Sequence, residues 1–150
     1  MAALVDTNIL VYRFDKRFPD KQKIATEILR RGILENSVRV PHQAIVEFIA
    51  AVARPIRGYA ILPLSDALRE AEEFLLQFTV LFPNDAIVRT AIRGCAAYQL
   101  SWFDAHLWSY ADHYGLPEIL TEDLQHERMY GKVKVINPFA GIRERGRKPE

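Results

Sequence analysis

Short apolar runs alternate with longer amphipathic stretches along most of the chain. Five runs have the length and apolar content of buried strands: residues 2–5, 38–40, 79–82, 118–121 and 133–136. The stretches between them place apolar side chains at helical spacing, over residues 7–14, 20–34, 42–53, 65–77, 85–98 and 102–114. This alternation predicts an α/β fold with three layers (α/β/α), in which helices cover both faces of a mainly parallel sheet of four to five short strands.

Polar residues mark the expected starts of several helices. We expect Asp20, Ser65 and Ser101 to cap the helices that follow them, and Thr7 to cap the first helix. A side-chain oxygen at such a position accepts a hydrogen bond from a free N–H group of the first turn. Residues 141–150 are basic and are predicted to be disordered, so a single domain is expected over residues 1–140.

Four carboxylates occupy positions that solvation alone does not explain. Asp6 ends the first apolar run, and Asp123 lies just past the fourth strand. Glu47 lies in a helix that is apolar nearly all round and therefore largely buried, and Asp104 lies in the first turn of the last helix. In a parallel sheet, residues beyond the carboxyl ends of the strands gather at one edge, so we expect these four side chains to converge there.

Converging carboxylates repel one another unless some are protonated or a divalent cation neutralises them. The second option is a hard-oxygen site for Mg²⁺ or Mn²⁺. Three of the four also have a simpler explanation: Asp6 could be a turn or cap residue, Asp104 could complete a cap begun by Ser101, and Asp123 could be a loop residue. Glu47 is the hardest to explain in this way, because a buried unpaired glutamate has little structural use. These explanations account for the residues singly, but not for all four at one edge.

Composition narrows the classes of function. The 150 residues carry 20 basic and 19 acidic side chains, so overall charge does not attract nucleic acid or membranes, and recognition must come from local clusters. The single cysteine excludes an internal disulfide and suits a reducing cytoplasm. No apolar stretch approaches the ~20 residues of a membrane span, and no secretory signal is visible. We therefore expect a cytoplasmic protein with no membrane partner.

The four acidic positions lie in segments that carry a family resemblance. These segments are Leu4-Val5-Asp6-Thr7-Asn8-Ile9-Leu10, Val46-Glu47-Phe48, Ser101-Trp102-Phe103-Asp104-Ala105 and Leu120-Thr121-Glu122-Asp123-Leu124-Gln125-His126. Over about residues 2–139, their order and spacing resemble the PIN-domain ribonucleases, specifically the VapC-like toxins of type II toxin–antitoxin systems. The chain departs from that pattern at Glu127, where the family often has glycine, and in the tail beyond Ala140.

The resemblance implies an endoribonuclease that hydrolyses RNA phosphodiester bonds with carboxylate-bound Mg²⁺ or Mn²⁺. We assign Asp6, Asp104 and Asp123 as metal ligands, direct or through water, and Glu47 as the residue that holds a water or acts as a base. Asn8 and Thr121 would orient carboxylates or contact the scissile phosphate. The implied partners are RNA, a VapB-like antitoxin that covers the acidic edge, and a second copy of the chain in a homodimer.

Contacts to RNA would have to come from local basic groups, because the net charge is only +1. The candidates are Arg13, Lys16, Arg17, Arg54, Arg57 and the basic tail. A PIN ribonuclease of RNA processing and a catalytically silent PIN-like scaffold for protein contacts fit the same motifs. A haloacid-dehalogenase-like phosphatase fits less well, because it needs a second acid two residues after Asp6, where this chain has Asn8.

Overall fold

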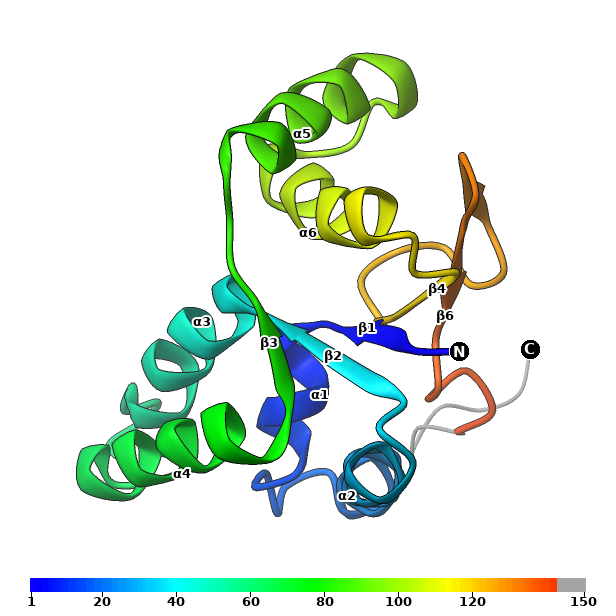
Figure 1. Cartoon of the computed structure of the whole chain (residues 1–150). Helices are drawn as coiled ribbons and strands as arrows, with labels where there is room; N and C mark the ends of the chain where they lie inside the picture. Colours follow the sequence, from blue (N-terminus) through cyan, green and yellow to red (C-terminus); the bar gives the residue numbers. More distant parts are fainter. Residues whose placement is uncertain (143–150) are drawn as a thin grey trace.

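One six-stranded sheet separates two layers of helices in the computed structural model, which describes residues 1–142 (Figure 1). The strands are β1 (Ala3–Val5), β2 (Val38–Pro41), β3 (Thr79–Leu81), β4 (Glu118–Leu120), β5 (Met129–Tyr130) and β6 (Val133–Ile136). Their order is β3-β2-β1-β4-β6-β5, and all neighbours are parallel except β5 and β6. The predicted three-layer fold with a mainly parallel sheet is confirmed.

The helices divide between the two faces of the sheet. The first layer holds α1 (Thr7–Tyr12), α2 (Pro19–Glu35), α3 (His42–Ala53) and α4 (Leu64–Gln77), and the second holds α5 (Asp85–Tyr98) and α6 (Trp102–Tyr114) (Figure 1). Successive side chains of a strand point to opposite faces of the sheet, so one strand contributes to the hydrophobic core on each face. Leu4 packs on the face covered by α5 and α6, whereas the next residue, Val5, packs on the face covered by α1–α4. Within residues 1–142, no helix is long and apolar enough to cross a membrane.

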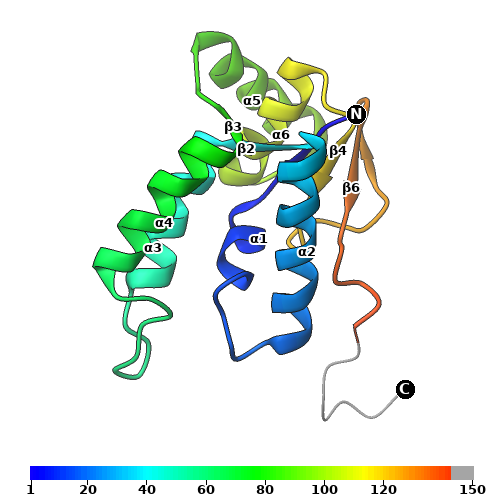
Figure 2. The ribbon, with the colours of Figure 1, turned by 60° about the horizontal axis from the view of Figure 1, so that its bottom comes forward.

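The chain order creates a switch point in the middle of the sheet. From β1 the chain moves outward through β2 to β3, and then returns to β4 on the other side of β1. Ligands of open α/β sheets bind beyond the carboxyl ends of the strands at such a point. Two connections, α1–α2 and α3–α4, lie together at one end of the first helical layer (Figure 2).

Several element boundaries differ from the prediction. Helix α2 begins at Pro19 and α4 at Leu64, one residue before the predicted caps Asp20 and Ser65, and neither helix has a side-chain cap. A proline explains both helix starts: Pro19 is the first residue of α2 and Pro63 directly precedes α4. The fixed φ of proline suits the start of a helix, so no capping side chain is needed. Ser101 does cap α6, accepting from the Asp104 N–H group. The two-residue strand β5 was not predicted, and residues 143–150 of the predicted tail lie outside the described residues.

Candidate active site

The register of β1 and β4 places Asp6 beside Thr121. Val5 and Leu120 are register partners at the carboxyl ends of these strands, so the residues that follow them are neighbours. The Thr121 hydroxyl donates to Asp6 Oδ2 at 2.7 Å and accepts from the Asp123 N–H group at 3.1 Å. A single buried hydroxyl thus positions two of the predicted acidic residues.

Asp6 also caps α1, since its Oδ1 accepts from the Thr7 N–H group at 2.6 Å. The prediction that Thr7 caps this helix is therefore wrong. The Thr7 hydroxyl instead donates to Glu47 Oε2 at 2.6 Å, across from α1 to α3. Local geometry explains the exchange: Asp6 has the extended backbone of a cap residue, whereas Thr7 is already the first residue of the helix.

Glu47 is held from both sides by a chain of hydrogen bonds. Its other oxygen, Oε1, accepts from the Gln43 amide at 3.0 Å, and Gln43 Oε1 in turn lies 2.6 Å from His106 Nδ1 on α6. Because an amide oxygen only accepts, His106 Nδ1 carries the proton. Glu47 is half-buried, not largely buried as predicted, because α3 exposes Val46 and its neighbours on one side.

The adjacent acids Glu122 and Asp123 have different surroundings. Glu122 accepts from the Tyr12 hydroxyl and forms a 2.8 Å ion pair with Lys21. Asp123 accepts from the Asn8 amide at 3.2 Å. Glu122 is thus paired with a cation, whereas Asp123 meets a neutral amide.

Asp104 lies apart from the hydrogen-bond network of the other acids. It occupies the first turn of α6, where its backbone N–H group donates to Ser101 Oγ at 3.2 Å. Its carboxylate lies close enough to Asp123 to raise the pKa of that residue by repulsion. The structure thus brings Asp6, Glu47 and Asp123 together and leaves Asp104 at the border of the group.

Burial and repulsion both disturb the acid group. Burial, the largest cause, raises the pKa of Asp6 to about 6; repulsion from Asp123 and Glu47 adds to the rise, and hydrogen bonds from Thr121 and Thr7 oppose it. The pKa of Asp123 is also raised, first by burial and then by repulsion from Glu122. Perturbed carboxylates at a strand edge are typical of a functional site.

A cavity of about 340 Å³ opens over these residues. Asp6, Asn8, Glu47 and Asp123 line it, together with Asp15 and Arg17 from the α1–α2 connection. Asp15 is buried, and its carboxylate forms a bidentate ion pair with Arg17 at 2.9 and 2.8 Å. Sequence reasoning missed this buried carboxylate, because Asp15 stands in a mixed charged stretch that resembles an ordinary solvated loop.

The donor chemistry of the cavity fits a hard divalent cation. Its lining offers carboxylate and amide oxygens, which are hard donors, and Asn8 Oδ1 is buried with no hydrogen-bond partner in residues 1–142. In that same part of the chain, no three His, Cys, Asp or Glu side chains are arranged to enclose an ion. Mg²⁺ suits such a site, because it usually binds one or two carboxylates and keeps several waters.

Comparisons with solved structures reveal several similar chains, of which three are described here. One belongs to a toxin–antitoxin complex from Klebsiella pneumoniae, with a TM-score of 0.64 and 18% identity over 91% of this chain and 98% of that one. Another belongs to FitAcB from Neisseria gonorrhoeae, with a TM-score of 0.66 and 20% identity over 92% and 99%. The third is Mycobacterium tuberculosis VapC20, described as a sarcin–ricin loop cleaving toxin, with a TM-score of 0.56 and 13% identity over 81% and 90%.

These similarities establish the fold alone, because the sequence identity is 20% or less in each pair. No curated protein sequence matches the chain. The model of the PIN domain family matches residues 3–132, which include all four predicted acidic positions. The chain belongs to the PIN domain family.

Proposed function

We propose that the protein is a Mg²⁺- or Mn²⁺-dependent endoribonuclease and the toxin of a VapBC-type toxin–antitoxin pair. The observation that carries this proposal is the gathering of Asp6, Glu47 and Asp123 around one cavity at the switch point of a PIN-domain sheet. One similar fold comes from a toxin–antitoxin complex and another from a protein described as a sarcin–ricin loop cleaving toxin, which supports the role of a cleaving toxin for this chain.

The bound cation would be held by Asp6 and Asp123, with Asp104 contributing through water. When bound, it neutralises charge on the phosphoryl oxygens and lowers the pKa of water to make a nucleophile at neutral pH. Thr121 holds both ligand residues in place, and Asn8 orients the Asp123 carboxylate. Glu47, which Thr7 and Gln43 hold by hydrogen bonds, would accept a proton from the attacking water.

Cleavage of RNA by the full chain tests the nuclease proposal. Protein freed of contaminating nuclease should cut RNA with Mn²⁺ or Mg²⁺ and lose that activity in EDTA. Asp6→Asn and Asp104→Asn should abolish cleavage without loss of fold, whereas Asp112→Asn, on the exposed side of α6, should leave it unchanged. Full activity of either active-site variant would refute the assignment.

A growth assay tests the toxin proposal separately. Expression of the chain should arrest growth, and co-expression of a small antitoxin encoded by a neighbouring gene should restore it. In the proposed complex, a basic side chain of the antitoxin covers the acidic edge of the sheet. The proposed location is the cytoplasm, and the chain is proposed to form a homodimer. RNA cleavage without growth arrest would instead indicate a PIN ribonuclease of RNA processing.

A further inference from the structure

The segment that follows β4, residues 121–126, is neither helix nor strand and carries two acidic side chains. We call this segment the acidic loop. Asp123 is exposed and lines the cavity over Asp6, whereas the Glu122 side chain is only 22% exposed and does not line that cavity. Because the acidic loop lacks the regular backbone hydrogen bonds of a helix or a strand, side-chain contacts have to fix the direction of Asp123.

Helix α1 contacts the acidic loop at two successive points. Asn8 and Tyr12 are four residues apart, so they lie on the same side of the helix. Asn8 donates to Asp123 at 3.2 Å in an exposed contact, and the Tyr12 hydroxyl donates to Glu122. Lys21 Nζ strengthens the second contact, since it donates to the Tyr12 hydroxyl at 3.2 Å and to Glu122 Oε2 at 2.8 Å. The contact at Glu122 is therefore the stronger of the two.

Lys21 is enclosed by aromatic rings. Its Nζ atom lies 4.9, 5.6 and 5.7 Å from the ring centres of Tyr12, Phe18 and Phe139, within the ~6 Å range of cation–π attraction. The rings of Phe18 and Phe139 pack edge to face on Tyr12, with centres 5.7 and 5.1 Å away. The Lys21 side chain is only 19% exposed. Its ammonium group therefore has a fixed position, to which Glu122 is attracted.

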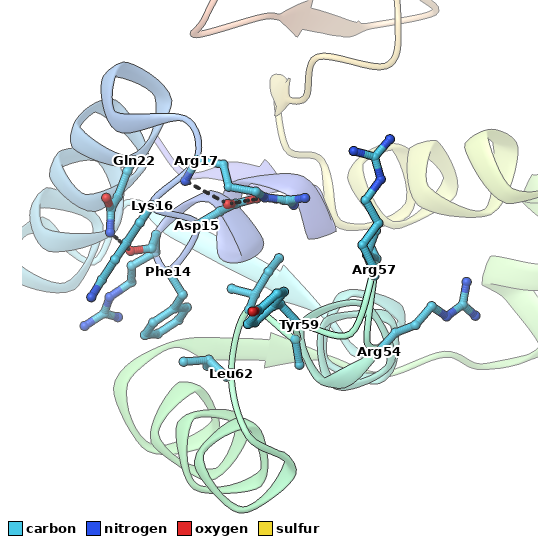
Figure 3. Close-up of a pocket in the computed structure, with 13 residues that line it drawn as sticks. Phe14, Asp15, Lys16, Arg17, Gln22, Arg54, Arg57, Tyr59 and Leu62 are labelled. Carbon is cyan, nitrogen blue, oxygen red and sulfur yellow. Dashed lines mark hydrogen bonds and ion pairs between the residues drawn. The ribbon is translucent and has the colours of Figure 1, made fainter.

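Helix α2, which carries Lys21, is anchored to the end of α1. The Gln22 amide donates to the Arg13 carbonyl at 3.1 Å. Within the α1–α2 connection, Arg17 donates to the Asp15 carboxylate from both its backbone N–H group and its guanidinium group (Figure 3). Because these contacts fix α2 relative to α1, the two helices set the position of the ammonium group independently of the acidic loop.

We infer that Tyr12, Lys21 and Glu122 form a clamp that positions Asp123 for cation binding. A largely buried ion pair adds little to stability, because lost hydration offsets most of its attraction, but it favours one arrangement of the chain over others. This inference rests on the proposed function, in which Asp123 is a cation ligand, and adds three positioning residues to it. The rival role for Lys21 is that of a nearby positive charge, which would only repel a bound cation.

The Lys21→Met variant gives opposite results for the two roles. If Lys21 acted only through its charge, this variant would bind Mn²⁺ more tightly than the wild type. In the clamp, the same change frees Glu122, so we expect Mn²⁺ binding to weaken about three- to tenfold, less than the ~10–100-fold typical of residues that bond a metal ligand directly. Lys21→Arg keeps the cation and should keep most of the affinity. Titration of the full chain, with free Mn²⁺ followed by electron paramagnetic resonance, measures the affinity.

Tyr12→Phe tests the clamp without a change of charge. It removes the hydroxyl contact to Glu122 and keeps the ring that packs on Phe18 and Phe139, so it should fold even if Lys21→Met does not. We expect a similar weakening of Mn²⁺ binding, and little further loss when both changes are combined, because they break one unit. Lys23→Met, an exposed lysine on the same helix, and Tyr114→Phe, an exposed tyrosine on α6, should bind Mn²⁺ like the wild type.

The Asn8 side-chain amide gives a readout without metal. In EDTA its ¹⁵N–¹H resonance, identified by its absence from Asn8→Ala, reports the bond to Asp123. In Tyr12→Phe we expect this resonance to move toward its position in Asp123→Ala, where the bond is lost. A clamp that only stabilised the fold would lower the urea midpoint and leave the resonance in place.

The outcomes separate this inference from the proposed function. A shifted Asn8 resonance in Tyr12→Phe, together with no Mn²⁺ binding by the wild type, would keep the positioning of Asp123 and refute the metal-dependent nuclease. Mn²⁺ binding and RNA cleavage by the wild type, with unchanged Mn²⁺ affinity in Tyr12→Phe, would overturn the clamp and keep the nuclease. Tighter Mn²⁺ binding by Lys21→Met would likewise overturn the clamp.

Discussion

At the residue scale, the acidic side chains differ in whether a basic side chain neutralises them, and those without one are the candidates for binding a cation. Glu122 and Asp123 are adjacent in sequence but have different partners. Glu122 forms an ion pair with Lys21 and accepts a hydrogen bond from Tyr12. Asp123 accepts a hydrogen bond from the neutral amide of Asn8. Asp15 likewise forms an ion pair with Arg17. Asp6, Glu47 and Asp123, which line the cavity at the carboxyl edge of the sheet, have no such cation within residues 1–142, and their mutual repulsion is what a divalent ion would relieve.

Asp6 predicts a pH dependence of stability in metal-free protein. Its folded pKa of about 6 exceeds its ordinary value of 3.8, so the folded chain binds this proton more tightly than the unfolded chain does. The associated stability is present below about pH 4 and is lost as pH rises through about 6, by at most about 3 kcal/mol. Urea unfolding in EDTA should therefore show Asp6→Asn to be more stable than the wild type at neutral pH, with no such gain near pH 4. An equal difference at both values would contradict this origin.

Gln43 predicts a positioning effect on Glu47. Gln43→Leu removes the link between Glu47 and His106, so the Glu47 carboxylate loses one of its two holding contacts. We expect an RNA cleavage rate about tenfold lower at saturating RNA, with little change in RNA affinity. Single-turnover kinetics measure both quantities, and Gln77→Leu at the exposed end of α4 is the matched control. A change in affinity alone would contradict a role in positioning Glu47.

Part of this site could be predicted from sequence and part could not. Asp6 and Asp123 could be predicted, because a carboxylate directly after a buried strand must lie at the carboxyl edge of a parallel sheet. The Thr7–Glu47–Gln43–His106 chain could not, because it joins residues 40 and 63 positions apart. Such pairs depend on how α1, α3 and α6 cross, which periodicity does not encode.

At the element scale, apolar periodicity located the elements better than capping residues located their ends. All five predicted strands are present, because each is a short, mainly apolar run bounded by polar or turn residues. The starts of α2 and α4 were misplaced by one residue, because Pro19 and Pro63 set the backbone there without a side-chain cap. Strand β5 has only two residues, too few for any period, and depends on antiparallel pairing with β6.

Close packing of α5 on α6 yields a prediction for Gly94. A Cβ atom at this buried position would lie 2.6 Å from Trp108 Cζ3, and Trp108 is fixed by a hydrogen bond from its indole N–H group to the Tyr130 carbonyl. Gly94→Ala should gain about 1 kcal/mol of helix propensity but lose more to overpacking, for a net loss on the order of 1–2 kcal/mol. Urea unfolding followed by tryptophan fluorescence measures it, with Ala96→Ser on the exposed side as control. An unchanged midpoint would mean that the two helices separate easily.

At the scale of the whole molecule, the order of the strands in the sheet decides where the acidic residues meet. Alternating strands and helices predicted a parallel sheet but not the order β3-β2-β1-β4-β6-β5, which depends on which side of β1 each strand is added. That order puts the switch point between β1 and β4, directly under Asp6 and Thr121.

The surface of α4 carries the last prediction, a homodimer. Leu64, Leu68 and Leu75 share one stripe of this helix and are 57%, 48% and 49% exposed. A stripe of this kind on a monomer stays in contact with water at a cost, which pairing with a second copy would relieve. Light scattering after gel filtration should therefore give twice the 17.3 kDa chain mass at micromolar concentration. The double variant Leu68→Lys with Leu75→Lys should give a monomer, because two like charges would meet in the paired stripe, whereas Glu73→Lys on the far side of α4 should remain dimeric. A monomeric wild type would refute the homodimer, and a dimer in the double variant would mean that the contact lies elsewhere.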